Sequence, residues 1–257
     1  MKKIKVALIG ASMRVRPCAR ELTSRYSDSH ELCAIMDVDV GKMRGWNESL
    51  DMNLPAYTDF DLLCDEIKPD LVIITTVDAY HAQYVVQALD RKIASISEKP
   101  LCVNAEQCRD ILEAQRRNPE VFAATTHNAR YGVVARKLKE LLDDGAIGRV
   151  RSVIYSEMLD LRHGLSYFRR WNSRKELSGG LQIHKSSHHF DKLNWVLDSK
   201  VSTLTASGKL VAYGSGAAPA RSTHCHCCLN PCKYKAKFDP ITQDIFFKYS
   251  HFGVRFC

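Results

Sequence analysis

The sequence predicts an α/β fold, with a doubly wound parallel sheet over residues 1–127 and an α+β, open-sheet domain over residues 128–257. Two observations predict it. Up to residue 126, short apolar segments of strand length alternate with segments of helical pattern, which is typical of a parallel sheet covered on both faces. After Asn128 this alternation stops, and a long strand-like segment has no helix soon after it.

The elements of the first domain follow from local patterns. Residues 5–9 are a compact apolar run that ends at Gly10, and Pro69 introduces the apolar run 71–75. The predicted strands are 5–9, 31–36, 71–75, 93–97 and 121–126, and the predicted helices are 17–26, 59–67, 81–89 and 105–117. Right-handed crossovers would place the carboxyl ends of these strands, and any ligand, along one edge of the sheet.

The second domain is predicted from fewer signals. The patterns indicate a helix over 133–143, a strand over 150–158, a helix over 184–197 and a strand over 201–208. Residues 241–257 contain apolar side chains but no closing element. Because one or two strands and a helix cannot cover the apolar face of a sheet, this domain looks incomplete.

Charge and hydropathy argue against several classes of protein. The net charge of +8 comes from basic residues spread along the chain, whereas proteins that bind nucleic acid usually concentrate them on one face or arm. The longest apolar runs, such as 71–74, are far shorter than the ~20 residues of a membrane span. A strand begins directly after Lys3, without the cleavage site of a signal peptide. We therefore expect a cytoplasmic protein that binds neither nucleic acid nor membrane.

Nine of the ten cysteines fall into two groups, and the tenth is Cys257. Five are scattered through predicted helices and strands, where reduced thiols are usual; they are Cys18, Cys33, Cys64, Cys102 and Cys108. The other group is crowded beside two histidines, and its spacing at Cys225, Cys228 and Cys232 is compatible with zinc. Reduced thiols in a surface loop are the simpler interpretation, so no resident metal is expected.

The turn after the first predicted strand is a candidate dinucleotide site. Such a site needs a tight glycine turn, so that backbone N–H groups and a helix N-terminus meet the pyrophosphate. Only the first glycine of the usual pattern is present, at Gly10, but Ser12 and Arg14 can contact phosphate. Asp37 ends the second predicted strand, where a carboxylate binds the ribose hydroxyls and favours NAD. Lys42 and Arg44 leave NADP open.

A lysine between an acid and a proline marks the same edge of the sheet. Lys99 follows the fourth predicted strand, where sheets of this kind bind ligands. Its ammonium group can donate to a substrate hydroxyl or to a developing alkoxide, and Glu98 can hold it in place. An exposed turn is the alternative for this tripeptide taken alone.

The helix predicted from His184 carries further candidates. His184, His188 and Asp191 are spaced i, i+4 and i+7, so they share one face of a helix. A histidine is suited to accept the proton of an alcohol because its pKa lies near neutrality. Two histidines at this spacing are also compatible with zinc, so a zinc hydrolase using His184 and His188 stays open.

In this order, the motifs resemble the Gfo/Idh/MocA oxidoreductase family. The match covers most of the chain to about residue 235; its motifs are the first strand and turn, Thr75 to His81, Glu98-Lys99-Pro100, His127 to Tyr131, Gly145 to Gly148, Arg170-Trp171, and Gly179-Gly180 with the histidine helix. The resemblance implies a Rossmann-type first domain and an open-sheet substrate domain, which is normally longer than here and forms the usual oligomer interface.

The resemblance also implies roles for individual residues. Lys99 would be the catalytic lysine and His188 the catalytic histidine, while His184 stands where the family often has an aspartate and is a third catalytic candidate. The residues around the cofactor would be Gly10, Ser12, Met13, Arg14, Asp37, Thr76, His81 and Glu98. The substrate side would be lined by Asn128, Arg130, Tyr131, Arg170 and Trp171, with Lys185 and Asp191 on the histidine helix.

The resulting hypothesis is an NAD(P)-dependent dehydrogenase that acts on a hydroxyl carbon of a sugar or polyol, with Lys99 and His188 handling the proton. We expect a homo-oligomer if the second domain is complete. A non-catalytic nucleotide-binding or regulatory protein is the alternative, motivated by the abrupt end of the sequence.

Overall fold

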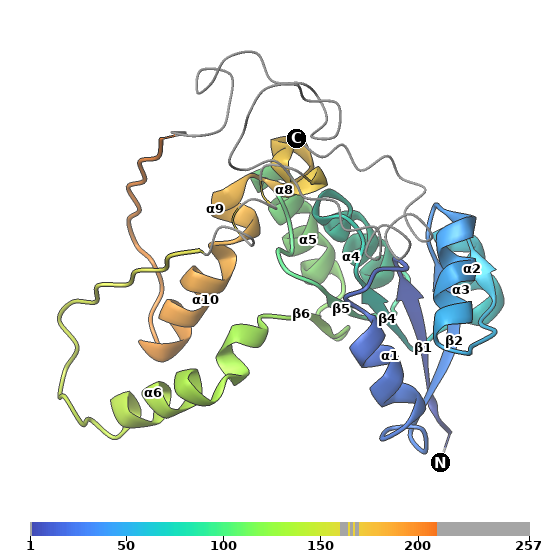
Figure 1. Cartoon of the computed structure of the whole chain (residues 1–257), viewed down its shortest axis with the longest axis horizontal. Coiled ribbons are helices and arrows are strands. Elements are labelled where there is room, and N and C mark those ends of the chain that lie inside the picture. The colour runs from blue at the N-terminus through green and yellow to red at the C-terminus, as the bar shows by residue number, and fades with distance from the viewer. Residues whose placement is uncertain (1, 160–163, 165–166, 168–169, 210–257) are drawn as a thin grey trace, which may run out of the picture.

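The computed structural model describes residues 2–159, 164, 167 and 170–209. Its centre is a parallel sheet with the strand order β3-β2-β1-β4-β5-β6 (Figure 1). The strands are β1 (Ile4–Ile9), β2 (His30–Met36), β3 (Ala56–Tyr57), β4 (Leu71–Ile74), β5 (Ala94–Ser97) and β6 (Ala123–Thr125). The order reverses between β1 and β4, and such a switch point is where open α/β sheets bind ligands. The α/β prediction for the first domain is therefore confirmed.

Helices cover both faces of this sheet. They are α1 (Arg16–Thr23), α2 (Val40–Ser49), α3 (Phe60–Ile67), α4 (His81–Asp90) and α5 (Ala105–Arg117), with the 3-10 turn η1 (Asp78–Tyr80) before α4. Alternate residues of β1 point to opposite faces. Val6 and Leu8 pack in one apolar cluster with residues of α1 and α2, whereas Ala7 and Ile9 pack in the other with residues of α3, α4 and α5.

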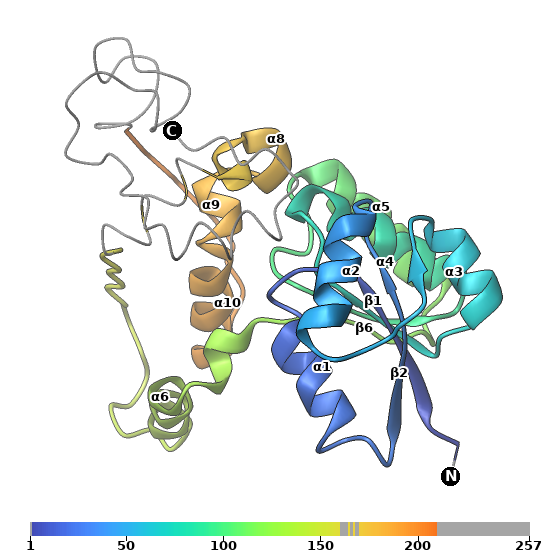
Figure 2. The same cartoon turned by 45° about the vertical axis from the view of Figure 1, so that its right-hand side comes forward.

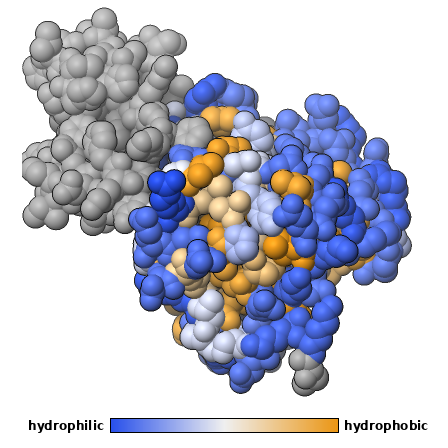
Figure 3. Space-filling view, turned by 90° about the vertical axis from the view of Figure 1, so that its right-hand side faces the viewer, coloured by the Kyte–Doolittle hydropathy of each residue, from blue (hydrophilic) through white to orange (hydrophobic). Residues whose placement is uncertain are grey.

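The face of the molecule that carries α2 and α3 is seen in Figure 3. Figure 3 shows hydrophobic residues in the middle of this face, surrounded by hydrophilic ones. Three apolar side chains of this region, Val38, Val40 and Leu62, are exposed. Among the residues with described placement, no helix has the length and apolar character needed to cross a membrane.

The chain after the sheet is mainly helical in its described part. It contains η2 (Asn128–Tyr131), α6 (Val133–Asp143), η3 (Trp171–Ser173), α8 (Lys175–Ser178), α9 (Leu181–His184) and α10 (Ser187–Val196). Helix α10 contacts α6 and η2, and α8 contacts η1 of the first half (Figures 1 and 2). The domain boundary predicted at residue 127 lies between β6 and η2, and the division itself stays a prediction.

Three sequence predictions for the second half differ from the structure. The segments 151–159 and 201–209, which include most of the two predicted strands, have no regular secondary structure. A strand needs a neighbour for its backbone groups, and no backbone hydrogen bond joins these segments to other described residues. The helix predicted over 184–197 is two helices, because α9 ends at His184 and α10 begins at Ser187.

Two elements of the first half were not predicted. Helix α2 begins after Asp39, whose Oδ1 accepts a hydrogen bond from the backbone N–H of Lys42 at 3.0 Å. This N-cap is a readable signal, but Gly41 and Gly45 obscure the helical pattern after it. Strand β3 has only two residues, Ala56 and Tyr57, which is too short for an alternating pattern.

Candidate active site

The β1–α1 turn is fixed by the close approach of two strand ends. Gly10 has a φ of +98°, and a Cβ atom there would lie 2.8 Å from the backbone of Thr75 and Thr76. The backbone N–H of Gly10 donates to the carbonyl of Met36 at 2.7 Å, and the Thr75 hydroxyl donates to the Gly10 carbonyl at 2.8 Å. Only glycine fits such a position. The turn is therefore held against both β2 and β4.

The residues after Gly10 suit a phosphate group. The Ser12 Oγ is buried and has no hydrogen-bond partner within the described structure, and buried hydroxyls nearly always have one. Arg14 is exposed, and so is Met13, at 69% of its surface. Helix α1 starts without a side-chain cap. An anionic ligand with several oxygens would satisfy this turn.

Asp37 ties the end of β2 to the same turn. Its Oδ2 accepts hydrogen bonds from the backbone N–H of Ala11 at 2.8 Å and from Lys42 Nζ at 2.8 Å. Its Oδ1 accepts from the backbone N–H of Asp39 at 3.1 Å. A carboxylate can accept about four hydrogen bonds, so one acceptor position at Oδ1 is left for a ribose hydroxyl.

His81 is buried between two loops at the carboxyl edge of the sheet. The ring is only 1% exposed. Its Nδ1 lies 2.7 Å from the carbonyl oxygen of Pro100, and its Nε2 lies 3.1 Å from that of Thr76. It therefore joins the segments after β4 and β5. Its contact with a cofactor stays a prediction. Thr76 is half-buried.

Lys99 lies just beyond the carboxyl end of β5. It is 6% exposed, and its Nζ donates a hydrogen bond to the carbonyl oxygen of His184 at 2.8 Å. Burial lowers the pKa of the Lys99 ammonium, while the charges of Asp78 and Glu98 oppose that shift. An ammonium group has three N–H donors, and the described residues accept one of them. Two donors remain for other oxygen atoms.

His184 is fixed by a carboxylate from the first half. Its Nδ1 is hydrogen-bonded to Oδ2 of Asp78, which is 3% exposed and opens η1 directly after β4. The rings of Tyr167 and Trp171 meet the imidazole edge-on, with centroid distances of 5.3 and 5.6 Å. Asp78 was not among the sequence candidates, although its place after a central strand could have marked it.

Glycine also brings helix α9 close to the segment after Lys99. Gly179 has a φ of +70°, and a Cβ atom there would lie 2.8 Å from the carbonyl oxygen of Val103 and 2.7 Å from the Cβ of Ile183. Any larger residue at 179 would push these parts of the chain apart. This contact explains part of the Gly179-Gly180 pattern in the sequence.

His188 is a buried imidazole surrounded by positive charge. Burial, followed by the charges of Lys99, His127 and Lys185, lowers its pKa to about 4. Its Nδ1 is buried and has no hydrogen-bond partner among the described atoms. The His127 ring meets it edge-on at a centroid distance of 5.9 Å. His188 is therefore neutral at neutral pH and can accept a proton.

Asp191 joins η2 to α10. It accepts two hydrogen bonds from Arg130, one of them from Nε at 2.7 Å, and the His127 Nδ1 lies 3.8 Å from its Oδ1. The Arg130 guanidinium also lies over the ring of Trp195 at 6.0 Å. Arg130 and Asp191, both predicted on the substrate side, thus largely satisfy each other. His127 belongs to a motif named from the sequence but was given no role there, although it lies just beyond the end of β6.

A second ion-pair cluster involves a residue that the sequence did not single out. Glu157 lies 3.0 Å from Lys185 Nζ and 2.5 Å from His189 Nε2. The hydrogen bond from Lys185 is the main cause of a lowered pKa at Glu157. The charge of Lys185, a predicted substrate residue, is therefore paired with a carboxylate of the irregular segment 151–159.

The remaining substrate candidates differ in exposure. Asn128, Tyr131 and Arg170 are exposed to solvent, with Tyr131 at 74%. Trp171 is half-buried against His184. Glu98 is half-buried, and its backbone N–H donates to the carbonyl of Ile74 at 2.8 Å. The structure thus brings Lys99, His184, His188 and Trp171 together and leaves three candidates facing water.

The described residues contain no group of three His, Cys, Asp or Glu side chains that could hold a metal ion. The cluster Cys225, Cys228 and Cys232 lies outside the described residues. The five scattered cysteines named above, which the structure describes, are free thiols. Burial is the main cause that raises the pKa of Cys33, Cys64 and Cys102 to about 11.

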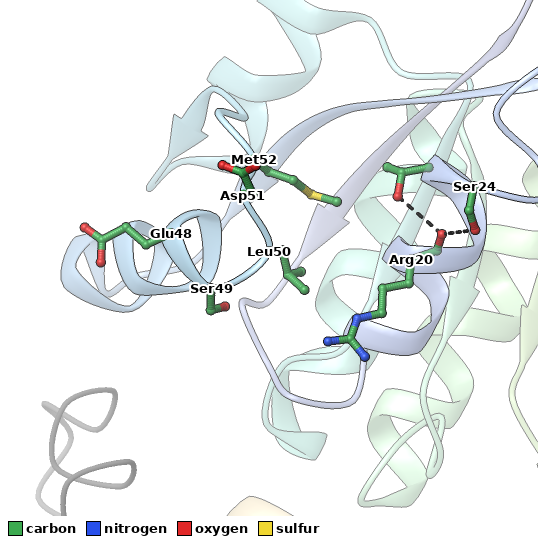
Figure 4. Close-up of a pocket in the computed structure, with 8 residues that line it drawn as sticks. Arg20, Ser24, Glu48, Ser49, Leu50, Asp51 and Met52 are labelled. Carbon is green, nitrogen blue, oxygen red and sulfur yellow. Dashed lines mark hydrogen bonds between the residues drawn. The ribbon is translucent and has the colours of Figure 1, made fainter.

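A groove of about 440 Å³ lies away from these residues. It is formed between the end of α1 and the end of α2, and Figure 4 shows Arg20 and Ser24 on one side and Glu48 to Met52 on the other. Both helices run from the carboxyl edge of the sheet to its amino edge, so this groove is at the opposite edge from the candidate site. It contains none of the candidate site residues.

Comparison with known proteins gives the family. A model described as "Oxidoreductase family, NAD-binding Rossmann fold" matches residues 4–126, and that of the family's C-terminal α/β domain matches residues 139–249. The chain belongs to the Gfo/Idh/MocA oxidoreductase family. The resemblance inferred from the motifs is therefore confirmed.

Individual relatives are similar over part of their length. The Bacillus subtilis protein YteT, named as an oxidoreductase, is 35% identical over 207 residues, which are 79% of this chain and 47% of YteT. Inositol 2-dehydrogenase of Salmonella typhimurium is 25% identical over 78% of this chain and 56% of that protein. The chain therefore spans about half the length of these relatives.

The fold is shared with solved structures. Scyllo-inositol dehydrogenase of Lactobacillus casei, with bound cofactor NAD(H) and scyllo-inositol, matches with a TM-score of 0.63 at 22% identity, over 77% of this chain and 57% of that chain. This likeness confirms the Rossmann-type fold of the described residues.

Proposed function

We propose that this protein is an NAD-dependent oxidoreductase that acts on a CH–OH group of a sugar or polyol. The observation that carries the proposal is the cluster at the carboxyl edge of the sheet. There the Lys99 ammonium donates a hydrogen bond to the carbonyl of His184, and the neutral His188 lies close enough for the charge of Lys99 to lower its pKa. Relatives named as inositol dehydrogenases support this class of substrate.

The turn at Gly10 and the end of β2 would hold the cofactor. Gly10 makes the tight turn after β1 that a pyrophosphate site needs, and Ser12 Oγ lacks a partner that a phosphate oxygen would supply. Asp37 would accept a hydrogen bond from a ribose hydroxyl, and its charge disfavours the 2′-phosphate of NADP. When bound, NAD takes up the hydrogen that leaves the substrate carbon together with its electron pair.

Lys99 and His188 would divide the work on the reacting hydroxyl. The free N–H donors of Lys99 stabilise negative charge as it develops on the substrate oxygen. His188 is neutral, so its unpartnered ring nitrogen can take the hydroxyl proton. Trp171, Lys185, the half-buried Arg130 and the exposed Asn128, Tyr131 and Arg170 would face the rest of the substrate. A cytoplasmic location and a homo-oligomer stay predictions from the sequence.

The proposal is tested by screening sugars and inositols for NAD reduction, followed through NADH absorbance. Lys99→Met should lower kcat by about 10²–10³-fold, the usual cost of losing a donor to a developing oxyanion, and should keep NAD affinity. Lys92→Met is a matched control, because Lys92 precedes the same strand and pairs with Glu120 on the surface.

Two outcomes would count against the proposal. Full activity of Lys99→Met would remove the lysine from the mechanism. NAD binding by the wild-type protein without turnover of any sugar or polyol would favour the alternative of a non-catalytic nucleotide-binding protein. Zinc that is bound in stoichiometric amounts, and lost when His184 and His188 are replaced, would favour the hydrolase.

A further inference from the structure

Asp78 and Lys99 hold the same residue from two neighbouring strands. Asp78 follows β4 and Lys99 follows β5, and these strands pair in parallel up to Ile74 and Ser97. The Asp78 carboxylate bonds the ring of His184, whereas the Lys99 ammonium bonds its carbonyl oxygen. His184 is thus fixed at both its side chain and its main chain. Both contacts cross from the sheet to the helices of the second half.

The Asp78 contact determines the state of the imidazole. An ionised carboxylate only accepts hydrogen bonds, so the shared proton lies on Nδ1 of His184. The rings of Tyr167 and Trp171 meet the imidazole edge-on and restrict its rotation. Asp78 is 3% exposed, and the contact of α8 with η1 closes this region further. This arrangement leaves His184 little freedom to move.

Asp78 also acts on Lys99 through charge. Burial is the main influence on the Lys99 pKa and lowers it; Asp78 is the largest of the charges that raise it, followed by Glu98. Arg14 and Lys185 act in the opposite direction. A buried ammonium without a nearby anion loses its proton readily. The Asp78 carboxylate therefore helps to keep Lys99 a hydrogen-bond donor.

We propose that Asp78 is a positioning residue that fixes His184 and, through the His184 carbonyl, places the Lys99 ammonium for the reaction. The proposal rests on the proposed function of Lys99. It also accounts for the imidazole at position 184, where the family resemblance implies an acid. In this chain the acid comes from the nucleotide-binding half and reaches the same place through the histidine ring.

The test compares Asp78→Asn with Asp61→Asn. Asparagine keeps the shape of Asp78 but removes its charge, and Asp61 is a carboxylate on α3 that pairs with Arg91 at the surface. Competitive acetylation across a pH series, followed by mass spectrometry of the peptide with Lys99, reports the pKa of this lysine without turnover. We expect it to fall in Asp78→Asn and to stay unchanged in Asp61→Asn.

Kinetics provide a second readout. In Asp78→Asn, kcat should fall by about 10²-fold, which is the cost of a misplacement near 1 Å. The KM for NAD should not change. The alkaline limb of the pH profile should move to lower pH. Should this variant not fold, nitrogen NMR of wild-type His184 still decides, because the proposal requires the proton on Nδ1. An Nδ1 without a proton, or wild-type values of the Lys99 pKa and kcat in Asp78→Asn, would overturn it.

The two proposals fail differently. A wild-type protein that oxidises no sugar or polyol contradicts the proposed function. The Lys99 titration and the His184 proton position need no substrate, so they test the positioning role even then.

Discussion

His188 has an acid–base behaviour that the sequence does not reveal. A histidine on a helix is expected to have a pKa near 6.5, but burial and the charges of Lys99, His127 and Lys185 lower the pKa of His188 to about 4. A base that is neutral over this wide range remains able to accept a proton in mildly acidic solution. The driving force for that transfer is correspondingly small until a substrate changes the surroundings.

The pH profile of the enzyme tests this behaviour. His188 must be deprotonated to act as a base, and a lowered pKa keeps it deprotonated as the pH falls through 6.5. We therefore expect kcat/KM for polyol oxidation to decline only as the pH approaches about 4. The profile should be measured together with circular dichroism, so that acid unfolding is recognised. A decline centred near pH 6.5 would show that His188 is not the base, or is not shielded as described.

The roles of single residues were partly readable from the sequence. Lys99 stood out because it lies between an acid and a proline at a strand end, and His188 because it shares a helix face with His184 and because the family resemblance implies a catalytic role for it. Asp78, His127 and Glu157 did not stand out, because their partners are far away in the chain: Asp78 meets His184, and Glu157 meets Lys185 and His189. Only folding shows that His81 turns both ring nitrogens toward carbonyl groups.

Among the elements, the β1–α1 turn depends most on one residue. Gly10 combines a positive φ with backbone atoms of the segment after β4 at 2.8 Å from the place of a Cβ. Gly145 has a similar φ of +70° but no atom within 4 Å of that place. Comparing substitutions at the two glycines therefore separates the free-energy cost of a positive φ from that of a steric clash.

We expect Gly10→Ala to lower the free energy of unfolding by about 3 kcal/mol or more, because the backbone of β4 cannot move aside cheaply. Gly145→Ala should cost only about 1–2 kcal/mol, the strain of a left-handed conformation. Urea unfolding of both variants measures the difference. Equal losses would mean that the turn at Gly10 adjusts more easily than its contacts indicate.

The strands and helices of the first half were predicted well because each is locally patterned. The helix 105–117 was predicted with the bounds of α5, since Asn104 caps it and its apolar positions recur at helical spacing. Strand β3 and the break between α9 and α10 were missed. They depend on pairing and on packing against other parts of the chain, which local patterns do not encode.

At the scale of the whole molecule, stability is unevenly distributed. Strands β1 and β4 lie in the centre of the sheet with paired backbone groups. The segments 151–159 and 201–209 have no backbone hydrogen bonds to other described residues. Their sequence pattern nevertheless predicted strands, because strand propensity records a tendency to pair and not the presence of a neighbour.

Hydrogen exchange should follow this distribution. Amides of β1 and β4 should exchange through global unfolding, whereas amides of 151–159 and 201–209 should exchange within the shortest labelling time. Peptide-resolved mass spectrometry makes the comparison in one experiment. Strong protection of the two segments would instead indicate that they pair in solution, for example with a second copy of the chain.

The contact of Lys99 with a main-chain oxygen has a consequence for the family as a whole. Every amino acid carries a carbonyl, so the lysine places no demand on the identity of residue 184. The carboxylate of Asp78 does, because it needs a side-chain donor there. In aligned sequences, positions 78 and 184 should covary. Positions 99 and 184 should not covary, although the three residues meet in space.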